Sequence, residues 1–173
     1  MVIMACNTSS ALALETVRSE YAFPILGVIL PGAQAAVQRG KRIGVLATPA
    51  TASSHAYRHA ILALQPQAKI WEVGCPEFVP LIEGDRLGDP ETLNIVKLYT
   101  SLLLDQRIDT LIYGCTHYPQ LHPLIEQVVP PSLHIVNPAA YVVAKASQEL
   151  DRGGIRKVLS AEKAATPIAA SVP

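Results

Sequence analysis

The chain has 173 residues, half of them hydrophobic, and its 14 Lys and Arg residues balance 14 Asp and Glu residues. This length allows one substantial domain or two small α/β lobes that share an interface. Because the charge is balanced and no basic run occurs, we expect no nucleic acid or membrane partner and favour a small molecule. No apolar stretch approaches the roughly 18 residues of a membrane-spanning helix, so we expect a soluble protein.

Short aliphatic segments alternate with helical patterns, which is typical of parallel βαβ architecture. The predicted strands contain few polar residues, so most of them should be buried on both faces. In chain order these strands are Val2–Ala5, Ile25–Val28, Ile43–Ala47, Lys69–Val73, Thr110–Tyr113 and His134–Val136. The predicted helices are Ser9–Glu20, Gly32–Arg39, Ser53–Leu64, Pro90–Asp105, Pro119–Val128 and Ala139–Leu150. The sequence therefore predicts an α/β fold.

Several residues fit the ends and faces of these helices. Pro31 and Pro119 suit a first helical turn, where a missing N–H costs nothing, and Gly40 suits a C-terminal cap. In the helix Pro90–Asp105, an apolar stripe at helical spacing is expected to be core; its members are Leu93, Val96, Leu98, Leu102 and Leu103.

Three cysteines, Cys6, Cys75 and Cys115, are widely spaced and form no CxxC pair. Their odd number and spacing indicate neither a disulfide framework nor a zinc site, and they fit a reducing, cytoplasmic compartment. Cys75 precedes a proline beside apolar residues, which favours a structural role. The histidines have no ligand spacing to one another or to Cys75, so no metal site is expected.

Cys6 and Cys115 each follow a predicted strand, in the segments ACNTSS and GCTHYP. In parallel α/β sheets, ligands bind beyond the carboxyl ends of the strands, where the next helix begins. The free N–H groups and the dipole of that helix favour anions, so a cysteine there can be held partly as thiolate. The alternative is that both cysteines are small buried residues.

Polar side chains surround these two turns. Thr48 and Thr51 lie at a further strand-to-helix turn, where they either line the same cleft or cap the next helix. Four side chains that follow the two cysteines are hydrogen-bonding groups suited to carboxylates: Asn7, Thr8, Thr116 and His117.

Two thiols that face one pocket would serve a definite reaction. To invert a stereocentre with an acidic C–H bond, a base must remove a proton from one face while an acid delivers a proton to the opposite face. A thiolate and a thiol exchange these roles when the reaction reverses. This is general acid-base catalysis without a covalent intermediate.

Five segments extend this interpretation to a known family: ACNTSS, PILGVILPGA, IGVLAT, CPEFVPLIE and GCTHYP. In this order they resemble the glutamate racemases of the aspartate/glutamate racemase superfamily. The resemblance implies two pseudo-symmetric parallel-sheet lobes and cofactor-independent interconversion of L- and D-glutamate, which supplies D-glutamate for peptidoglycan. It also implies an enzyme that often forms homodimers.

The resemblance assigns roles by position. Cys6 and Cys115 match the two catalytic cysteines of the family. Glu83 resembles the acidic partner of His117, and a histidine held by a carboxylate can assist deprotonation of Cys115. Alternatively, Glu83 is an ordinary solvated acid in a loop. The residues that match the substrate-binding positions are Asn7, Thr8, Thr116 and His117.

The family's Asp-Ser-Gly turn after a first strand and its later Pro-Tyr-Gly turn do not occur in this sequence. We therefore expect an incomplete first lobe, made of residues 1–23 and 131–151, beside a whole second lobe over 24–130. We also expect little or no racemase activity from this chain alone. Asn137 stands where relatives tend to have an aspartate, and residues 152–173 are predicted to be a poorly ordered tail.

Three other functions stay open on the sequence. The nearest is a racemase of the same superfamily that acts on aspartate or a hydantoin. A cysteine hydrolase with Cys115 as nucleophile and His117 as base is a different class. It is disfavoured because residues two apart at a strand end tend to diverge, and because Cys6 is left without a role. The third is a non-catalytic chain that binds a partner.

Overall fold

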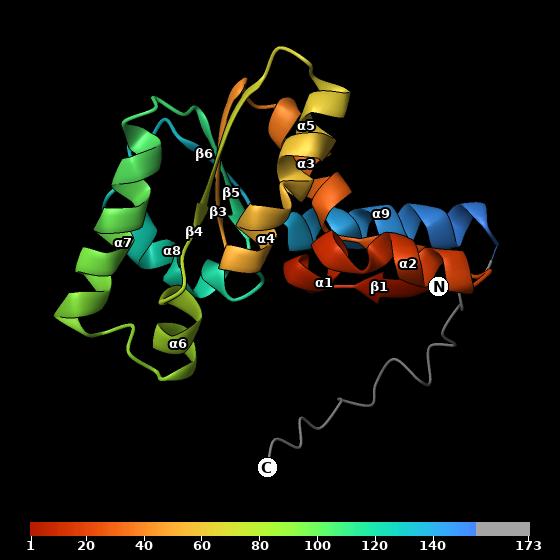
Figure 1. The fold of residues 1–173 in the computed structure, drawn as a ribbon, viewed down its shortest axis with the longest axis horizontal. Coiled ribbons are helices and arrows are strands. Elements are labelled where there is room, and N and C mark those ends of the chain that lie inside the picture. The colour runs from red at the N-terminus through yellow and green to blue at the C-terminus, as the bar shows by residue number, and fades with distance from the viewer. Residues whose placement is uncertain (155–173) are drawn as a thin grey trace, which may run out of the picture.

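Parallel strands form two separate sheets (Figure 1). The smaller sheet pairs β1 (Val2–Met4) with β2 (Ile25–Gly27). The larger sheet has the strand order β4-β3-β5-β6, with bounds Arg42–Ala47 for β3, Lys69–Gly74 for β4, Thr110–Gly114 for β5 and His134–Val136 for β6. The computed structural model describes residues 1–154, and each predicted strand is confirmed there to within one residue at either end. The predicted tail lies outside the described residues from 155 onward.

Helices connect these strands, and three predicted helices are each divided in two: the predicted helix Pro119–Val128 is a 3-10 turn followed by a short α-helix that ends at Ile125, and two others divide within the chain's first 64 residues. The first divides at Ala13, and the second at His55, whose left-handed backbone (φ 54°) ends one helix and begins the next. A short helix over Phe78–Glu83 was not predicted; its Pro80 lies in the first turn, where a missing N–H is tolerated. In chain order the helices are α1 (Asn7–Leu12), α2 (Leu14–Glu20), α3 (Ile29–Val37), α4 (Pro49–Ser54), α5 (Ala56–Leu64), α6 (Phe78–Glu83), α7 (Pro90–Leu104), the 3-10 turn η1 (Tyr118–Leu121), α8 (His122–Ile125) and α9 (Pro138–Arg152).

The central strands β3 and β5 of the larger sheet are buried on both faces, as predicted, whereas its edge strands β4 and β6 are only partly buried. Helices α3 and α5 cover one face, and α6, α7 and α8 cover the other (Figure 1). Val45 and Ile112 pack toward the first group of helices, whereas Leu46 and Leu111 pack toward the second. Strand β1 is different, because Val2 and Ile3 keep 45% and 37% of their surface exposed.

Two strands are hydrogen-bonded to strands that the predicted boundaries place in the other lobe. The boundaries put β2 in the second lobe, but β2 is hydrogen-bonded to β1. They put β6 in the first lobe, but β6 is hydrogen-bonded to β5. An apolar strand of three residues does not show in its sequence which strand it pairs with, so the pattern could not decide this. The division of the chain into lobes stays a prediction.

The apolar stripe of α7 is only partly core. Val96 and Leu103 are fully buried, whereas Leu98 and Leu102 are 57% and 49% exposed, so the expectation is wrong for these two residues. Leu98 is two positions after Val96, which is about 200° around the helix axis, so it points away from the sheet.

The carboxylate of Asp109 holds the amino ends of β3 and β5 together. Its oxygens accept hydrogen bonds from the backbone N–H groups of Lys41 and Arg42 at 3.0 and 3.2 Å, and from the hydroxyl of Thr110 at 3.0 Å. The predicted capping residue Gly40 does donate to Ala36 at the end of α3. The Asp109 carboxylate is a stronger reason for a glycine at position 40, because a Cβ atom there would lie 1.8 Å from an Asp109 oxygen.

We predict that Gly40→Ala lowers the free energy of unfolding by about 2 kcal/mol, because the Asp109 carboxylate must give up backbone hydrogen bonds to make room. The matched control is Gly88→Ala, since a Cβ at Gly88 meets no atom within 4 Å and its backbone is not left-handed. Denaturant unfolding of both variants measures the difference. Equal stability of the two variants would contradict this role for Asp109.

Candidate active site

The larger sheet places three of the candidate turns at one edge. Thr48, Cys75 and Cys115 directly follow β3, β4 and β5, and these strands are parallel and adjacent. Gly114 permits the close approach of β5 to β3, because a Cβ there would lie 2.8 Å from the carbonyl oxygen of Leu46. The position of Cys115 therefore depends on a glycine immediately before it.

Cys6 begins α1 and lies on the smaller sheet's side of this edge. It occupies the N-cap position and is exposed to solvent. Partial burial raises the pKa of its thiol, but hydrogen bonds from Ser9 and Thr8 outweigh burial and leave the pKa below the usual thiol value. The predicted anion-favouring environment is therefore present at Cys6.

Three threonine hydroxyls join the start of α1 to the start of α4. Thr8 Oγ1 lies 2.8 Å from Thr48 Oγ1 and 3.1 Å from Thr51 Oγ1, and the last two lie 3.0 Å apart. Thr48 also caps α4 through the backbone N–H of Thr51. Capping is thus confirmed for Thr48, the hydroxyl contacts place both threonines beside Thr8, and a role in lining a cleft stays a prediction.

Asn7 is bonded to a residue that the sequence analysis did not identify. The buried hydroxyl of Tyr57 on α5 donates to Asn7 Oδ1 at 2.6 Å, and both side chains are almost completely inaccessible to solvent. Nothing in the local pattern around Tyr57 distinguishes it from an ordinary core aromatic residue of an amphipathic helix.

The second turn brings Cys115, His117 and Glu83 together. Cys115 Sγ lies 3.6 Å from His117 Nδ1, and His117 Nε2 lies 3.2 Å from Glu83 Oε1. A carboxylate only accepts hydrogen bonds, so Nε2 carries the proton and Nδ1 faces the thiol. The expectation that residues 115 and 117 diverge is wrong, because the backbone turns into η1 at His117. Glu83 is the last residue of α6, and its side chain is 65% exposed.

The two thiols have opposite pKa shifts. Burial raises the pKa of Cys115, the N–H groups of His117 and Tyr118 lower it in part, and negative charge on Cys6 and Glu83 raises it again. The charge on Cys6 acts on Cys115, so the two thiols lie within electrostatic range of each other. The shifts make Cys6 the more acidic of the two thiols.

The remaining candidates have simple places in the fold. Thr116 is exposed between Cys115 and His117. Cys75 is buried, and burial is the main cause that raises the pKa of its thiol to about 12, which fits the predicted structural role. Asn137 caps α9 by accepting from the N–H of Ala139 at 3.1 Å.

Two kinds of feature are absent from the part of the chain that the structure describes. Over residues 1–154, no three His, Cys, Asp or Glu side chains are grouped in a way that would hold a metal ion. None of the helices in the same residues combines the length and the apolar character that crossing a membrane requires.

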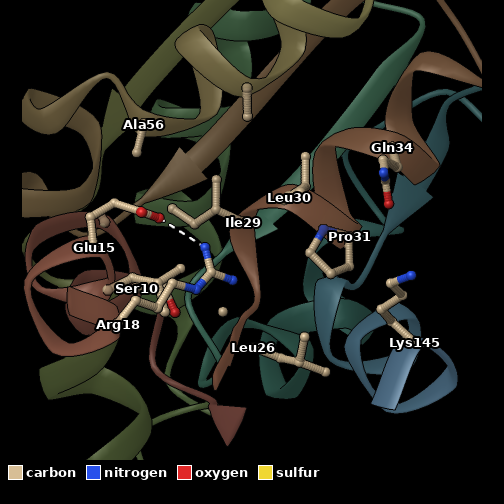
Figure 2. Close-up of a pocket in the computed structure, with 14 residues that line it drawn as sticks. Ser10, Glu15, Arg18, Leu26, Ile29, Leu30, Pro31, Gln34, Ala56 and Lys145 are labelled. Atoms are coloured by element: carbon tan, nitrogen blue, oxygen red, sulfur yellow. Dashed lines mark hydrogen bonds and ion pairs between the residues drawn. The ribbon is translucent and has the colours of Figure 1, made fainter. Parts of the chain in front are cut away.

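A cavity of about 290 Å³ lies near the Cys6 turn but is not lined by either Cys6 or Cys115. Figure 2 shows its apolar wall, which includes Leu26, Ile29, Leu30 and Pro31. Charged side chains rim it: Glu15 and Arg18 form an ion pair at 2.8 Å, and Lys145 lies on the other side. The candidate residues for proton transfer thus lie outside this cavity.

Comparisons with known proteins identify relatives of the whole described region. The family model for Asp/Glu/hydantoin racemases matches residues 1–146. Glutamate racemase of Gloeothece citriformis is 61% identical over 92% of this chain and 57% of its own length, and that of a Nostoc species is 61% identical over 90% and 53%. The chain therefore spans little more than half the length of these relatives.

Solved structures agree with the sequence relatives. A glutamate racemase from Francisella tularensis in complex with D-glutamate superimposes with a TM-score of 0.86 at 30% identity, over 91% of this chain and 59% of that one. A glutamate racemase isoform from Bacillus anthracis superimposes with a TM-score of 0.84 at 33% identity, over 88% and 58%. On the family match and these identities, the chain belongs to the Asp/Glu/hydantoin racemase family.

Proposed function

We propose that this chain carries the proton-transfer groups of a cofactor-independent glutamate racemase. The observation that carries the proposal is the placement of two thiols, Cys6 at the N-cap of α1 and Cys115 directly after β5 with His117 Nδ1 3.6 Å away. Their pKa values are shifted in opposite directions, which supports the same assignment. In one direction, the Cys6 thiolate removes the α-proton from one face of the amino acid. The Cys115 thiol delivers a proton to the opposite face, and the roles exchange when the reaction reverses.

Substrate binding in this proposal uses the hydrogen-bonding groups beside each thiol. These groups suit the two carboxylates of glutamate, and they are Asn7, Thr8, Thr116 and His117. The Francisella relative was solved with D-glutamate, and named glutamate racemases are 61% identical to this chain, which supports glutamate as the substrate.

His117 has a separate role in the proposal. With Nε2–H donating to Glu83, its Nδ1 can accept the proton of Cys115 and return it, so that either thiol can start a cycle as the base. Glu83 fixes the ring and its tautomer. Because Glu83 is largely exposed, solvent weakens this bond, so Glu83 contributes less than the histidine.

We further propose the biological setting that the family resemblance implies. The product D-glutamate would supply peptidoglycan synthesis in the cytoplasm, and the enzyme would act as a homodimer. The named relatives are about twice as long as the matched region, and a low racemase rate is proposed for this chain alone, so each kinetic comparison is a ratio between this chain and its own variants.

A cysteine hydrolase is the second candidate, and one observation favours it. Cys115, His117 and Glu83 are arranged in the order of nucleophile, base and orienting acid. The raised pKa of Cys115 disfavours a resting thiolate there, and the scheme leaves Cys6 without a role. A racemase of aspartate or of a hydantoin differs in the substrate that it accepts, so assays with glutamate, aspartate and a hydantoin distinguish these activities.

The first prediction concerns the thiols. In deuterated water with D- or L-glutamate, Cys6→Ala and Cys115→Ala should each lower deuterium incorporation at the α-carbon at least about 100-fold, because each removes one of the two proton carriers. Cys75→Ala is the control and should retain the rate. Proton NMR and mass spectrometry follow the exchange. A cleaved product without deuterium incorporation would indicate the hydrolase instead.

The second prediction concerns pH. The base must be deprotonated, so kcat/KM should rise through the pKa of Cys6, below the usual thiol value of 9.0. The acid must keep its proton, so kcat/KM should fall through the pKa of Cys115, above 9.0. Ser9→Ala removes a hydrogen bond to Cys6 and should move the rising limb to higher pH, whereas Ser19→Ala on the exposed side of α2 should not. An unmoved limb would argue against Cys6 as the base.

The third prediction ranks Glu83 below His117. Glu83→Gln should lower kcat/KM by no more than about fivefold, because an exposed ion pair contributes little. His117→Gln should lower it at least about tenfold, because it removes the proton acceptor beside Cys115. Steady-state kinetics of both variants under identical conditions gives the ranking. The reverse order would place the essential group on α6.

A further inference from the structure

Tyr57 lies beneath the Cys6 turn and makes one specific contact there. It is the second residue of α5, and its ring is fully buried in the core between the larger sheet and its helices. Its hydroxyl lies 2.6 Å from the side-chain oxygen of Asn7, fifty residues earlier in the chain. Asn7 is the first residue of α1, directly after Cys6, and only 2% of its surface is exposed.

The polarity of this contact is fixed by the groups involved. An amide oxygen only accepts hydrogen bonds, so the Tyr57 hydroxyl is the donor. Burial, and secondarily negative charge on Cys115, raise the pKa of Tyr57 well above its usual value, so the hydroxyl keeps its proton. Among residues 1–154, the Asn7 side chain makes this one hydrogen bond, and its amide NH₂ group has no acceptor within those residues.

The bond therefore selects one of two orientations of the Asn7 amide. The terminal torsion of asparagine is broad and roughly two-fold, so without a partner the oxygen and the NH₂ group exchange places at little cost. With the oxygen held by Tyr57, the NH₂ group is turned to the opposite side. A carboxylate can accept from that NH₂ group, whereas it would be repelled by the amide oxygen.

We propose that Tyr57 is a positioning residue that holds the Asn7 amide with its NH₂ group available to a carboxylate of the substrate. The inference rests on the proposed function, because it takes Asn7 as a substrate-binding residue. Tyr57 lies on α5, which packs on the larger sheet, and Asn7 lies on α1, which follows a strand of the smaller sheet. In this proposal a residue of one part of the fold determines which group Asn7 in the other part can bind. Tyr57 acts through Asn7 and does not transfer a proton.

The kinetic test is Tyr57→Phe, which removes only the hydroxyl. We expect KM for glutamate to rise about tenfold while kcat stays within about twofold, because binding is lost and the thiols are unchanged. Tyr113→Phe is the matched control: Tyr113 is also buried and also makes one hydroxyl hydrogen bond, 2.8 Å to His122 Nδ1. A purely structural loss would lower the active fraction, and hence kcat, at unchanged KM.

Two further variants separate positioning from stability. Asn7→Asp retains an acceptor for Tyr57 but has no NH₂ donor, so it should also raise KM. Because it places a carboxyl group at a buried position, it should also lower the unfolding temperature, and KM of the folded fraction is therefore the readout. In an Asn7→Ala background, Tyr57→Phe should cause no further rise in KM. Additive effects in that background, or a Tyr57→Phe variant that binds glutamate normally, would overturn the proposal.

One readout does not depend on turnover. In ¹⁵N-labelled protein, Tyr57→Phe should shift the side-chain NH₂ resonances of Asn7, and Tyr113→Phe should leave them in place. Unmoved resonances would overturn the positioning bond whatever the activity. If these resonances move but the wild-type chain neither binds nor exchanges glutamate, the bond stands, and both the proposed function and the substrate role of Asn7 fail.

Discussion

The two thiols follow strands of different sheets, so their relative position depends on how the start of α1 packs against α4 and α5. No strand of the smaller sheet is hydrogen-bonded to the larger one within the described residues. The join near the thiols is instead made of side chains: the hydroxyls of Thr8, Thr48 and Thr51, and the bond between Tyr57 and Asn7. Directional hydrogen bonds of this kind fix orientation as well as distance. They can hold a short helix of six residues, whose own stability is small.

The chemistry follows from the unequal environments of two identical side chains. Cys6 is exposed at a helix N-terminus and receives hydrogen bonds, whereas Cys115 is buried against the core. Each effect alone is ordinary for a cysteine. Together they separate the two pKa values. Negative charge on Cys6 raises the pKa of Cys115, so loss of the proton from Cys6 favours retention of the proton on Cys115. The two environments make Cys6 the more acidic of the two thiols, and the proposed proton exchange uses this difference.

The sequence was sufficient where a local pattern determines the outcome. Apolar strands identified the sheet positions, and cysteines at the ends of two strands identified both turns, because parallel strands present their carboxyl ends to ligands. Where a distant contact decides, the pattern carried no information. The left-handed residue His55 and the partner strands of β2 and β6 depend on contacts that the local pattern does not show. The bond from Tyr57 to Asn7 is of the same kind. The outward turn of Leu98 is different, because it follows from the helical period that the predicted stripe did not respect.

Strand β5 links stability to the site through its two ends. At its amino end, Asp109 binds the backbone of Lys41 and Arg42 and so fixes the register of β5 against β3. At its carboxyl end, Gly114 lets the same pair of strands approach closely just before Cys115. A slip of one residue would turn every side chain of β5 to the other face of the sheet and move Cys115 away from the Thr48 turn. The register bonds, although far from the thiols, therefore determine which groups of the second turn can face Cys6.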